Sequence, residues 1–586
     1  MRWFLFLPLA VCIAQGAYAP RSGAADAPNV LVVITDDQGF GDLGAHGNPI
    51  LKTPELDRFA KQSAWLKNFY VCPVCSPTRA SLLTGQYNYR TGVVDTFIGR
   101  SLMRPDVKTL PEYLAAAGYR TGLFGKWHLG DNYPLRPEDR GFQETLWCQG
   151  GGLAQPSDPP QADPKTAYFD PILKQNGKEV KTKGYCTDVF TDAAVKFVTA
   201  DSKKPFFAYV AFNAPHGPYQ VPEEFAAKYA KRDLSADAFP KTGQPWAGPK
   251  LNTTEIANAY GMIENIDTNF GRLMKALEDR KLRDNTIVIF LTDNGPGGVR
   301  WNAGLRNRKG TVYEGGIRVP CYIRWPAQVK AGHVIDTPLA HIDITPTVLA
   351  ACGFVGNATF DGRSFDRMLA NTPGNWPGRT LFVQWHRGDE PEKYRAFAAR
   401  GPKYKLVQAA GTAPGTKWTP KYELFDIAAD PFEEKDIAAD KPDEVAQLKR
   451  EYETWFADVT KKGFAPPRIV IGSAHENPVR LSRQDWRGDK AGWNTDSVGH
   501  WEVKFERAGE YRVTVYAPGE FDSAVLRADR HTFEHSALPA GTFANKTSWN
   551  IELPAGDNRF EVTILLKDKS RGAHYVELEY LGPAKK

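Results

Sequence analysis

The 586-residue chain lacks several features that would assign it to a common class of protein. Beyond its N-terminal segment, no apolar run approaches the roughly eighteen residues that a membrane-spanning helix needs. Basic and acidic residues nearly balance, at 74 Lys and Arg against 68 Asp and Glu, and no basic run is dense. Internal repeats and low-complexity tracts are also absent. We therefore expect neither a transmembrane segment nor nucleic acid as a partner.

The composition that remains is that of a globular, loop-rich protein. Apolar residues make up 42% of the chain, which also contains 52 Gly and 43 Pro. This balance argues against a disordered or fibrous protein. The chain is too long for one hydrophobic core, so we expect two or three domains.

The N-terminal segment has the pattern of a signal peptide. Met1 and Arg2 form a short charged start, an apolar stretch covers 3–14, and Ala17-Tyr18-Ala19 is an A-x-A cleavage signal. We predict a signal peptide over 1–19, cleaved near Ala19, and a secreted or periplasmic mature protein.

Residues 20–375 alternate short apolar runs with helical stretches. This alternation predicts an α/β domain with a mainly parallel central sheet and flanking helices. Ligands of such sheets bind beyond the carboxyl ends of the strands, so the residues that follow each apolar run are informative. Four runs lead into polar segments of interest: 29–35, 119–124, 205–212 and 286–292.

Two of these runs end in residues that offer oxygen ligands. Asp36 and Asp37 follow the first run, and Asp293 and Asn294 follow the last. Carboxylate and amide oxygens suit Ca²⁺ or Mg²⁺ and not a soft transition metal. The alternative is that these residues merely start turns after strands, as Asp and Asn often do.

The other two runs lead into basic residues. Lys126 and His128 follow the run 119–124 and lie two residues apart, so on an extended chain both side chains would point the same way. His216 follows the run 205–212. Taken alone, a lysine is more often a solvated surface charge, and a histidine is more often structural than catalytic.

The segment 75–85, with the sequence CSPTRASLLTG, is the most informative part of the chain. Ser76 can cap a helix that begins at Pro77 and runs to about Leu83, with Gly85 ending it. Residue 75 then lies at a helix N-terminus, where backbone N–H groups favour an anion. Arg79, about one turn further on, can reach back to residue 75. The alternative is a buried or disulfide-bonded cysteine.

This segment resembles the C-x-P-x-R and L-T-G signature of the formylglycine-dependent sulfatases, the arylsulfatase-like members of the alkaline phosphatase superfamily. Further segments match the family in chain order: the paired aspartates, GKWHLG at 125–130, APH at 214–216, TDNG at 292–295 and KGTVYEGG at 309–316. One departure is Arg306-Asn307-Arg308, which replaces an expected glycine-rich lead-in to Lys309. The resemblance implies an alkaline-phosphatase-like fold.

The resemblance also implies a set of site residues. Cys75 would be oxidised to 3-oxoalanine (formylglycine) by a formylglycine-generating enzyme. The implied ligands of one Ca²⁺, with Mg²⁺ as the second choice, are Asp36, Asp37, Cys75, Asp293 and Asn294. The implied catalytic residues are Cys75, Arg79, Lys126, His128, His216 and Lys309. In this scheme His216, alone or with Lys309, protonates the leaving alcohol, and His128 is the base.

Cysteine is scarce in the chain, with seven residues in all. Loss of Cys12 with the signal peptide and conversion of Cys75 would leave five. An odd remainder predicts at least one free thiol unless a cysteine pairs outside the chain.

The C-terminal third predicts two further units. Residues 376–465 show antiparallel strands followed by a helix, and resemble the smaller C-terminal subdomain of the sulfatases. Here residues 385–387 could line the rim of the pocket or form a surface loop. Residues 466–586 alternate apolar and polar residues between turns, which predicts an appended all-β sandwich. Its Trp486, Trp493 and Trp501 could form a sugar-stacking platform or the core of the sandwich.

The function that we expect is hydrolysis of sulfate esters on a sulfated sugar or polysaccharide. One alternative is a phosphate or phosphonate monoester hydrolase of the same superfamily. A second alternative is a non-catalytic protein that binds anionic glycans.

Overall fold

The computed structural model describes residues 19–20 and 27–584, except 249, 356–358, 373, 375, 416, 518, 529–530, 537–544 and 568. The predicted signal peptide lies outside the described residues apart from Ala19. Among the described residues, no helix combines the length and the apolarity that crossing a membrane requires. The six cysteines in this part of the chain are all buried and unpaired.

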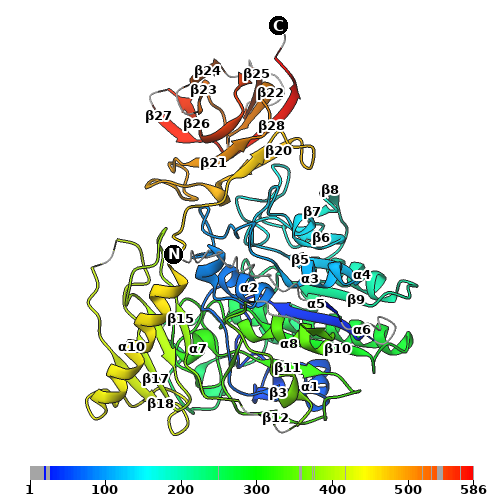
Figure 1. Cartoon of the computed structure of the whole chain (residues 1–586), viewed down its shortest axis with the longest axis vertical. Helices are drawn as coiled ribbons and strands as arrows, with labels where there is room; N and C mark the ends of the chain where they lie inside the picture. The colour runs from blue at the N-terminus through cyan, green and yellow to red at the C-terminus, as the bar shows by residue number, and fades with distance from the viewer. Residues whose placement is uncertain are drawn as a thin grey trace, which may run out of the picture.

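A ten-stranded sheet forms the centre of the molecule, with the strand order β12-β3-β11-β10-β2-β9-β5-β6-β7-β8 (Figure 1). Its middle strands, β10-β2-β9-β5-β6, are all parallel to their neighbours in that run. The strands are β2 (Asn29–Thr35), β3 (Ala64–Leu66), β5 (Arg120–Lys126), β6 (Glu144–Cys148), β7 (Ile172–Gln175), β8 (Lys178–Lys181), β9 (Phe206–Ala211), β10 (Thr286–Thr292), β11 (Cys321–Arg324) and β12 (Val334–Ile335). The predicted mainly parallel α/β fold is confirmed.

The register of the middle strands brings their carboxyl ends together. Thr35 of β2 lies opposite Thr292 of β10, so the residues that follow them are neighbours in space. Ala211 of β9 pairs with Ile34 of β2 and with Gly125 of β5. Four separate segments of the chain therefore deliver polar side chains to one edge of the sheet.

Helices cover both faces of this sheet, because its middle strands are apolar on both sides. In β2, Val30, Val32 and Ile34 pack into one core and Leu31 and Val33 into the other. The first core contains residues of α2, α3 and α8, and the second contains residues of α1, α4 and α6. The helices are α1 (Pro54–Lys61), α2 (Cys75–Thr84), α3 (Leu110–Ala116), α4 (Cys186–Thr199), α5 (Glu223–Ala230), α6 (Thr253–Asp279), α7 (Glu314–Ile317), α8 (Ile344–Ala351), α9 (Asp366–Leu369) and α10 (Pro442–Val459).

A smaller antiparallel sheet lies beside this body (Figure 1). Its strands are β15 (Leu381–Gln384), β16 (Phe397–Arg400), β17 (Tyr404–Gln408) and β18 (Glu423–Asp426). Helix α10 packs on it through a shared core that includes Leu406, Tyr452 and Trp455. Two short pairs complete the body, β1 (Ala19–Pro20) with β14 (Phe354–Val355) and β4 (Phe69–Tyr70) with β13 (Leu339–Ala340).

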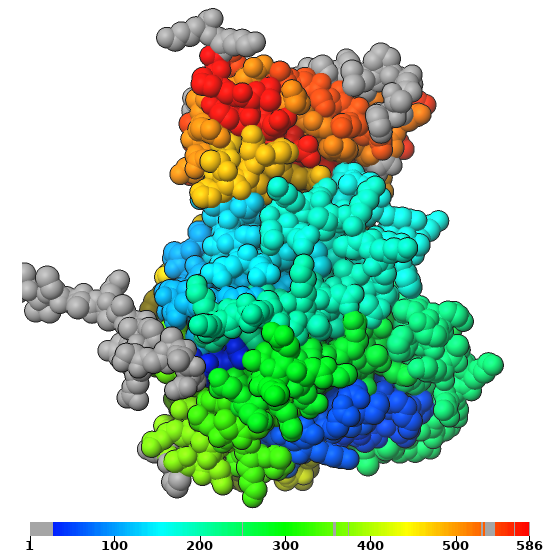
Figure 2. Space-filling model, turned by 90° about the vertical axis from the view of Figure 1, so that its right-hand side faces the viewer, coloured from blue at the N-terminus to red at the C-terminus, as the bar shows by residue number. Residues whose placement is uncertain are grey.

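The C-terminal region forms a β-sandwich seated on one end of the body (Figures 1 and 2). Its two sheets have the orders β19-β21-β26-β23-β24, with β27 on β26, and β20-β28-β22-β25. The strands are β19 (Ile469–Ile471), β20 (Val479–Ser482), β21 (His500–Phe505), β22 (Gly509–Tyr516), β23 (Ser523–Ala528), β24 (His531–Ser536), β25 (Lys546–Leu553), β26 (Gly556–Leu566), β27 (Lys569–Gly572) and β28 (Tyr575–Gly582).

Trp486, Trp493 and Trp501, the three residues considered for a sugar-stacking platform, do not form one. Trp486 and Trp501 are fully buried in its core, with ring centroids 5.7 Å apart. They fill the space between the two sheets, as large aromatics in small sandwiches usually do. Trp493 alone of the three is exposed.

Buried carboxylates lie where the sandwich meets the body. Burial raises the pKa of both Asp131 and Asp158 to about 7, and it raises the pKa of Asp485 well above its ordinary value. The hydroxyl of Tyr575, in the sandwich, donates to the backbone carbonyl of Asp158. A buried carboxyl group of this kind contributes its full stability only at a pH below its pKa in the unfolded chain. That contribution is lost as the pH rises through the pKa of the group in the folded protein.

We therefore predict that Asp158→Asn removes part of this pH dependence. We expect the free energy of unfolding of the variant, minus that of the wild type, to increase by about 1–3 kcal/mol from about pH 5 to about pH 8. Urea unfolding at several pH values measures the difference. The exposed Asp163 on the same segment supplies a control. For Asp163→Asn, the difference in free energy of unfolding from the wild type should change by less than about 0.5 kcal/mol over this pH range. If the difference in free energy of unfolding between Asp158→Asn and the wild type is the same at pH 5 and pH 8, the prediction is refuted.

Candidate active site

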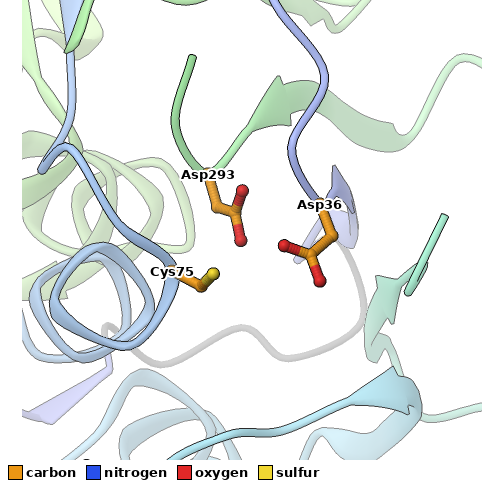
Figure 3. Close-up of side chains that lie close together, drawn as sticks. All are labelled: Asp36, Cys75 and Asp293. Atoms are coloured by element: carbon orange, nitrogen blue, oxygen red, sulfur yellow. The ribbon is translucent and has the colours of Figure 1, made fainter. Parts of the chain in front are cut away.

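Acidic side chains from two neighbouring strands meet the start of helix α2. Asp36 follows β2, Asp293 follows β10, and both carboxylates face the side chain of Cys75 (Figure 3). One oxygen of each carboxylate and Sγ of Cys75 all lie within 4.8 Å of one another. Asp37 and Asn294 belong to the same cluster, because Nδ2 of Asn294 donates to Oδ1 of Asp37 at 2.8 Å.

This cluster has the chemistry of a divalent-cation site. Oδ1 of Asp36 and Oδ1 of Asn294 are buried and have no hydrogen-bond partner among the described residues. Buried oxygens normally have a partner, so these two atoms indicate an additional group. Three carboxylates and an amide oxygen form a hard donor set that fits Ca²⁺ or Mg²⁺.

Each of the three carboxylates has its own cationic partner. Lys126 Nζ lies 2.6 Å from Asp36 Oδ2, and Lys309 Nζ lies 2.5 Å from Asp37 Oδ1. The third pair joins Arg79 Nη2 to Asp293 Oδ2 at 2.8 Å, with both side chains fully buried. Three positive and three negative charges balance, so a bound divalent cation would leave the site positive. A site of that sign suits an anionic substrate.

Burial and neighbouring charges shift the pKa values of Asp37 and Asp293 in opposite directions. Burial alone would raise the pKa of Asp37, but the ammonium of Lys309 and the ring of His216 bring it below the ordinary value. Burial and the neighbouring Asp36 carboxylate raise the pKa of Asp293 to about 6 despite Arg79. Burial likewise raises the pKa of the Cys75 thiol to about 12.

Helix α2 begins earlier than predicted. Its first residue is Cys75 and its N-cap is Val74, in extended conformation, whereas Ser76 was the predicted cap. Ser76 Oγ instead donates to the backbone carbonyl of His128 at 2.9 Å. Pro77 is tolerated at the third helical position because N–H groups of the first turn have no helical acceptor. Gly85 ends the helix with φ of 67°, as predicted.

Arg79 binds Asp293, which follows β10, and makes no hydrogen bond to residue 75. Its Nε and Nη2 donate to Asp293 Oδ2 at 3.2 and 2.8 Å, and its Nη1 donates to the carbonyl of Lys126 at 3.2 Å. Arg79 therefore holds α2 against the ends of β10 and β5, and it orients one of the acids that face Cys75.

Lys126 and His128 enter the site by different routes. The strand β5 ends at Lys126, and His128 has φ of 61°. The chain is therefore not extended from 126 to 128, and the prediction that both side chains point the same way on an extended chain does not hold. The ring Nε2 of His128 lies 2.6 Å from the carbonyl of Thr96, whereas its buried Nδ1 has no partner among the described residues. Burial lowers the pKa of His128 well below its ordinary value, so the ring is neutral at pH 7.

His216 and Lys309 are the most exposed of the predicted catalytic side chains, at 19% and 23%. His216 Nε2 lies 3.8 Å from Asp37 Oδ2, and its Nδ1 lies 2.6 Å from the carbonyl of Gly217. Lys309 Nζ lies 3.4 Å from Sγ of Cys75. These two side chains mark the open side of the site.

The unusual segment before Lys309 does not displace it. Lys309 N donates to the carbonyl of Pro296, and Gly310 N donates to that of Pro73. The guanidinium of Arg306 stacks on the ring of Tyr313, 3.9 Å from its centroid. These contacts fix the loop and direct Lys309 toward Cys75.

The sulfatase family model matches residues 28–354, and the model for the C-terminal part of N-sulphoglucosamine sulphohydrolase matches residues 306–461. The chain belongs to the sulfatase family. It is 32% identical to bovine (Bos taurus) arylsulfatase A over 491 residues, covering 76% of this chain and 88% of the relative. It is 25% identical to the N-acetylglucosamine-6-O-sulfatase of Bacteroides thetaiotaomicron, covering 78% of this chain and 91% of that one.

Solved structures agree with this membership. The crystal structure of Ps i-CgsB in complex with k-i-k-neocarrahexaose has a TM-score of 0.62 and 28% identity, and it covers 75% of this sulfatase and 95% of that chain. The phosphonate monoester hydrolase of Agrobacterium radiobacter has the same fold, with a TM-score of 0.54 and 22% identity over 74% of this chain and 96% of that one. The family model and the curated sulfatase relatives show that the chain is a sulfuric ester hydrolase.

Residues 95–97 of the sulfatase also border the site, although nothing in the sequence singled them out. The carbonyl of Thr96 faces His128 Nε2 and also accepts from Nε2 of Gln484, in the sandwich, at 2.9 Å. Contacts to a backbone carbonyl depend on no particular side chain, so no sequence motif could have revealed this one. The appended sandwich thus reaches the group that holds a candidate catalytic histidine.

Residues 385–387 have a mixed placement. Trp385 is buried, and its Nε1 donates to Asp95 Oδ1 at 2.9 Å. Arg387 remains partly exposed and binds the same carboxylate through Nη1 at 2.8 Å. This segment lies against the 95–97 loop of the sulfatase and is not a free surface loop.

Proposed function

We propose that this sulfatase removes sulfate from a carbohydrate, with formylglycine at position 75 and Ca²⁺ held beside it. The observation that carries the proposal is the position of Cys75. It begins helix α2, its Sγ lies 3.4 Å from Lys309 Nζ, and the carboxylates of Asp36 and Asp293 face it. A carbohydrate substrate is supported by the similarity to N-acetylglucosamine-6-O-sulfatase and to the carrageenan-oligosaccharide complex.

The proposed metal ligands are Asp36, Asp37, Asp293 and Asn294, together with residue 75. A cation bound there supplies positive charge that polarises the sulfate and the nucleophilic oxygen. Lys126 and Lys309 supply further positive charge on the same side, so negative charge that develops on the sulfate oxygens is neutralised.

Residue 75 as hydrated formylglycine would offer two hydroxyl groups: one would displace the alcohol from sulfur, and deprotonation of the other would restore the aldehyde and release sulfate. His128 is the proposed base that takes that proton. Since Nε2 faces the Thr96 carbonyl, Nε2 carries the hydrogen and the unpartnered Nδ1 is the free basic atom. The neutral state of the buried ring suits this role.

His216, with Lys309 beside it, is the proposed acid for the leaving alcohol. Its Nδ1 donates to the Gly217 carbonyl, which turns Nε2 toward Asp37 and the open side of the site. Burial lowers the pKa of His216 to about 4. A bound sulfate ester adds negative charge nearby and shifts this pKa upward, which favours the protonated ring when substrate is present.

A substrate comparison separates this proposal from phosphate or phosphonate monoester hydrolysis. We predict that kcat/KM for p-nitrophenyl sulfate exceeds that for p-nitrophenyl phosphate by at least roughly tenfold. The expected preference rests on the membership of the sulfatase family and on the sulfatases to which the chain is similar. A higher kcat/KM for the phosphate ester would assign the chain to the other activity. Absence of turnover on both would favour a protein that only binds anionic glycans.

The predicted signal peptide supports two further parts of the proposal. The chain would be exported and would act as a secreted or periplasmic enzyme. A formylglycine-generating enzyme would be its partner during maturation.

A further inference from the structure

Three separate parts of the chain meet beside the segment that contacts His128. They are the 95–97 loop of the body, the 385–387 segment that follows β15, and Trp493 of the sandwich. The rings of Phe97 and Trp493 contact edge to face, with centroids 5.3 Å apart. The guanidinium of Arg387 lies over the same Phe97 ring, 4.4 Å from its centroid.

This cluster of Phe97, Arg387 and Trp493 lies between two of the proposed catalytic residues. On one side, the carbonyl of Thr96 holds His128. On the other side, Trp385 packs so closely on Gly310, next to Lys309, that an added Cβ there would meet its ring at 3.3 Å. The cluster is therefore joined to the surroundings of His128 through Thr96 and to those of Lys309 through Trp385.

The surface of the cluster is aromatic and cationic. Trp493 is 38% exposed, whereas Trp486 and Trp501 are buried in the core of the sandwich. The side chain of Arg387 is 31% exposed. Its Nη1 binds Asp95 and Thr96, and its Nε and Nη2 make no hydrogen bond to the described residues. Two donors of a fixed guanidinium fork are thus available to a ligand.

Ion pairs centred on Asp95 and Asp389 hold the cluster in place. Asp95 is fully buried and binds Trp385, Arg387 and, at 3.7 Å, Arg100. Arg100 also binds Asp389, which pairs in turn with Arg487 of the sandwich at 3.4 Å. The body, the smaller sheet region and the sandwich are therefore tied together beneath the exposed side chains, which preorganises the surface.

We propose that Phe97, Arg387 and Trp493 form a subsite for the sugar that adjoins the one losing its sulfate. In this subsite the pyranose ring lies against Trp493, and an anionic group of that sugar binds the free N–H donors of Arg387. The inference rests on the proposed carbohydrate sulfatase activity and adds to it a substrate longer than a monosaccharide. It also gives the appended sandwich a part in substrate selection.

Trp493→Ala tests the subsite through substrate length. The quantity to measure is kcat/KM for a sulfated hexasaccharide divided by kcat/KM for p-nitrophenyl sulfate. We expect this ratio to fall roughly tenfold, as truncation of an aromatic residue at the centre of a binding contact often does. Leu581→Ala, which removes an exposed apolar side chain elsewhere on the sandwich, is the control and should leave the ratio unchanged. An unchanged ratio in Trp493→Ala overturns the proposal.

Arg387→Lys tests the anionic contact. Lysine can still pair with Asp95, but it lacks the additional N–H donors that Nε and Nη2 of the arginine offer. The hexasaccharides are prepared from carrageenan, where the anionic groups are sulfates, and from chondroitin sulfate, which adds uronic acid carboxylates. The ratio should fall at least threefold for the source whose anion binds here. An unchanged ratio for both sources overturns the role of Arg387.

Binding measurements separate failure of the subsite from failure of the proposed function. Calorimetry compares Cys75→Ala with the double variant Cys75→Ala/Trp493→Ala on the same hexasaccharides. A roughly tenfold higher Kd in the double variant supports the subsite even if the wild type turns over no sulfate ester. Equal Kd values, or turnover of p-nitrophenyl sulfate with no binding of either hexasaccharide, overturn it.

Discussion

Replacing Cys75 by alanine is expected to lower kcat on an aryl sulfate by at least about 10⁴-fold, as removal of a catalytic nucleophile does. The side chain faces Asp36 and Asp293, and Lys309 Nζ lies 3.4 Å from its sulfur. No other side chain in this cluster can form the proposed aldehyde. Steady-state kinetics on protein matured in a host with the modifying enzyme measures the loss.

The chain offers a matched control for this substitution. Cys352 is also buried and unpaired, but it directly follows α8 and packs in the core of the body. Cys352→Ala should keep kcat within about threefold, although it costs some stability because a buried side chain is shortened. Substantial turnover by Cys75→Ala would contradict the assigned nucleophile.

Removing divalent cations is expected to abolish turnover and to lower the melting temperature. The carboxylates of Asp36, Asp37 and Asp293 are buried together, and the oxygens of Asp36 and Asn294 that lack partners would lose their ligand. A ligand at a hundred to a thousand times its Kd stabilises a protein by about 3–4 kcal/mol, so the thermal shift should be measurable. Dialysis against EGTA, followed by activity and melting measurements, gives both readouts.

Adding back single cations identifies the metal. Ca²⁺ should restore turnover more fully than Mg²⁺, because several protein oxygens converge here and Mg²⁺ retains more of its water. Asp293→Asn should weaken the response, since it removes one carboxylate and leaves Arg79 buried without its charged partner. Full activity in protein shown by elemental analysis to be metal-free would refute the cation site.

Much of the catalytic fold followed from hydrophobic patterning and from the strand ends. The strands at 29–35 and 286–292 were predicted with the bounds that the structure shows. Their register then brings Asp36 beside Asp293, because parallel strands that start together also end together. The order of polar residues after the strands was therefore enough to place the acids in one cluster.

Details that depend on tertiary contacts could not be predicted. The sequence favoured Ser76 as a helix cap, but its hydroxyl bonds to the His128 carbonyl, 52 residues away. Arg79 was expected to turn toward residue 75 and instead pairs with Asp293, which only the packing of α2 against β10 brings within reach. In the sandwich, composition alone could not distinguish the buried Trp486 and Trp501 from the exposed Trp493.

Mass spectrometry of the tryptic peptide 68–79 is the measurement that tests the central claim most directly. Trypsin cleaves after Lys67 and Arg79, and the peptide contains Cys72 as well as Cys75. Formylglycine at position 75 predicts one alkylatable thiol, at Cys72, and a mass about 18 Da below that of the two-thiol peptide, with fragmentation placing the change at residue 75. Alkylation of both thiols in protein isolated from its native source would contradict the proposed nucleophile.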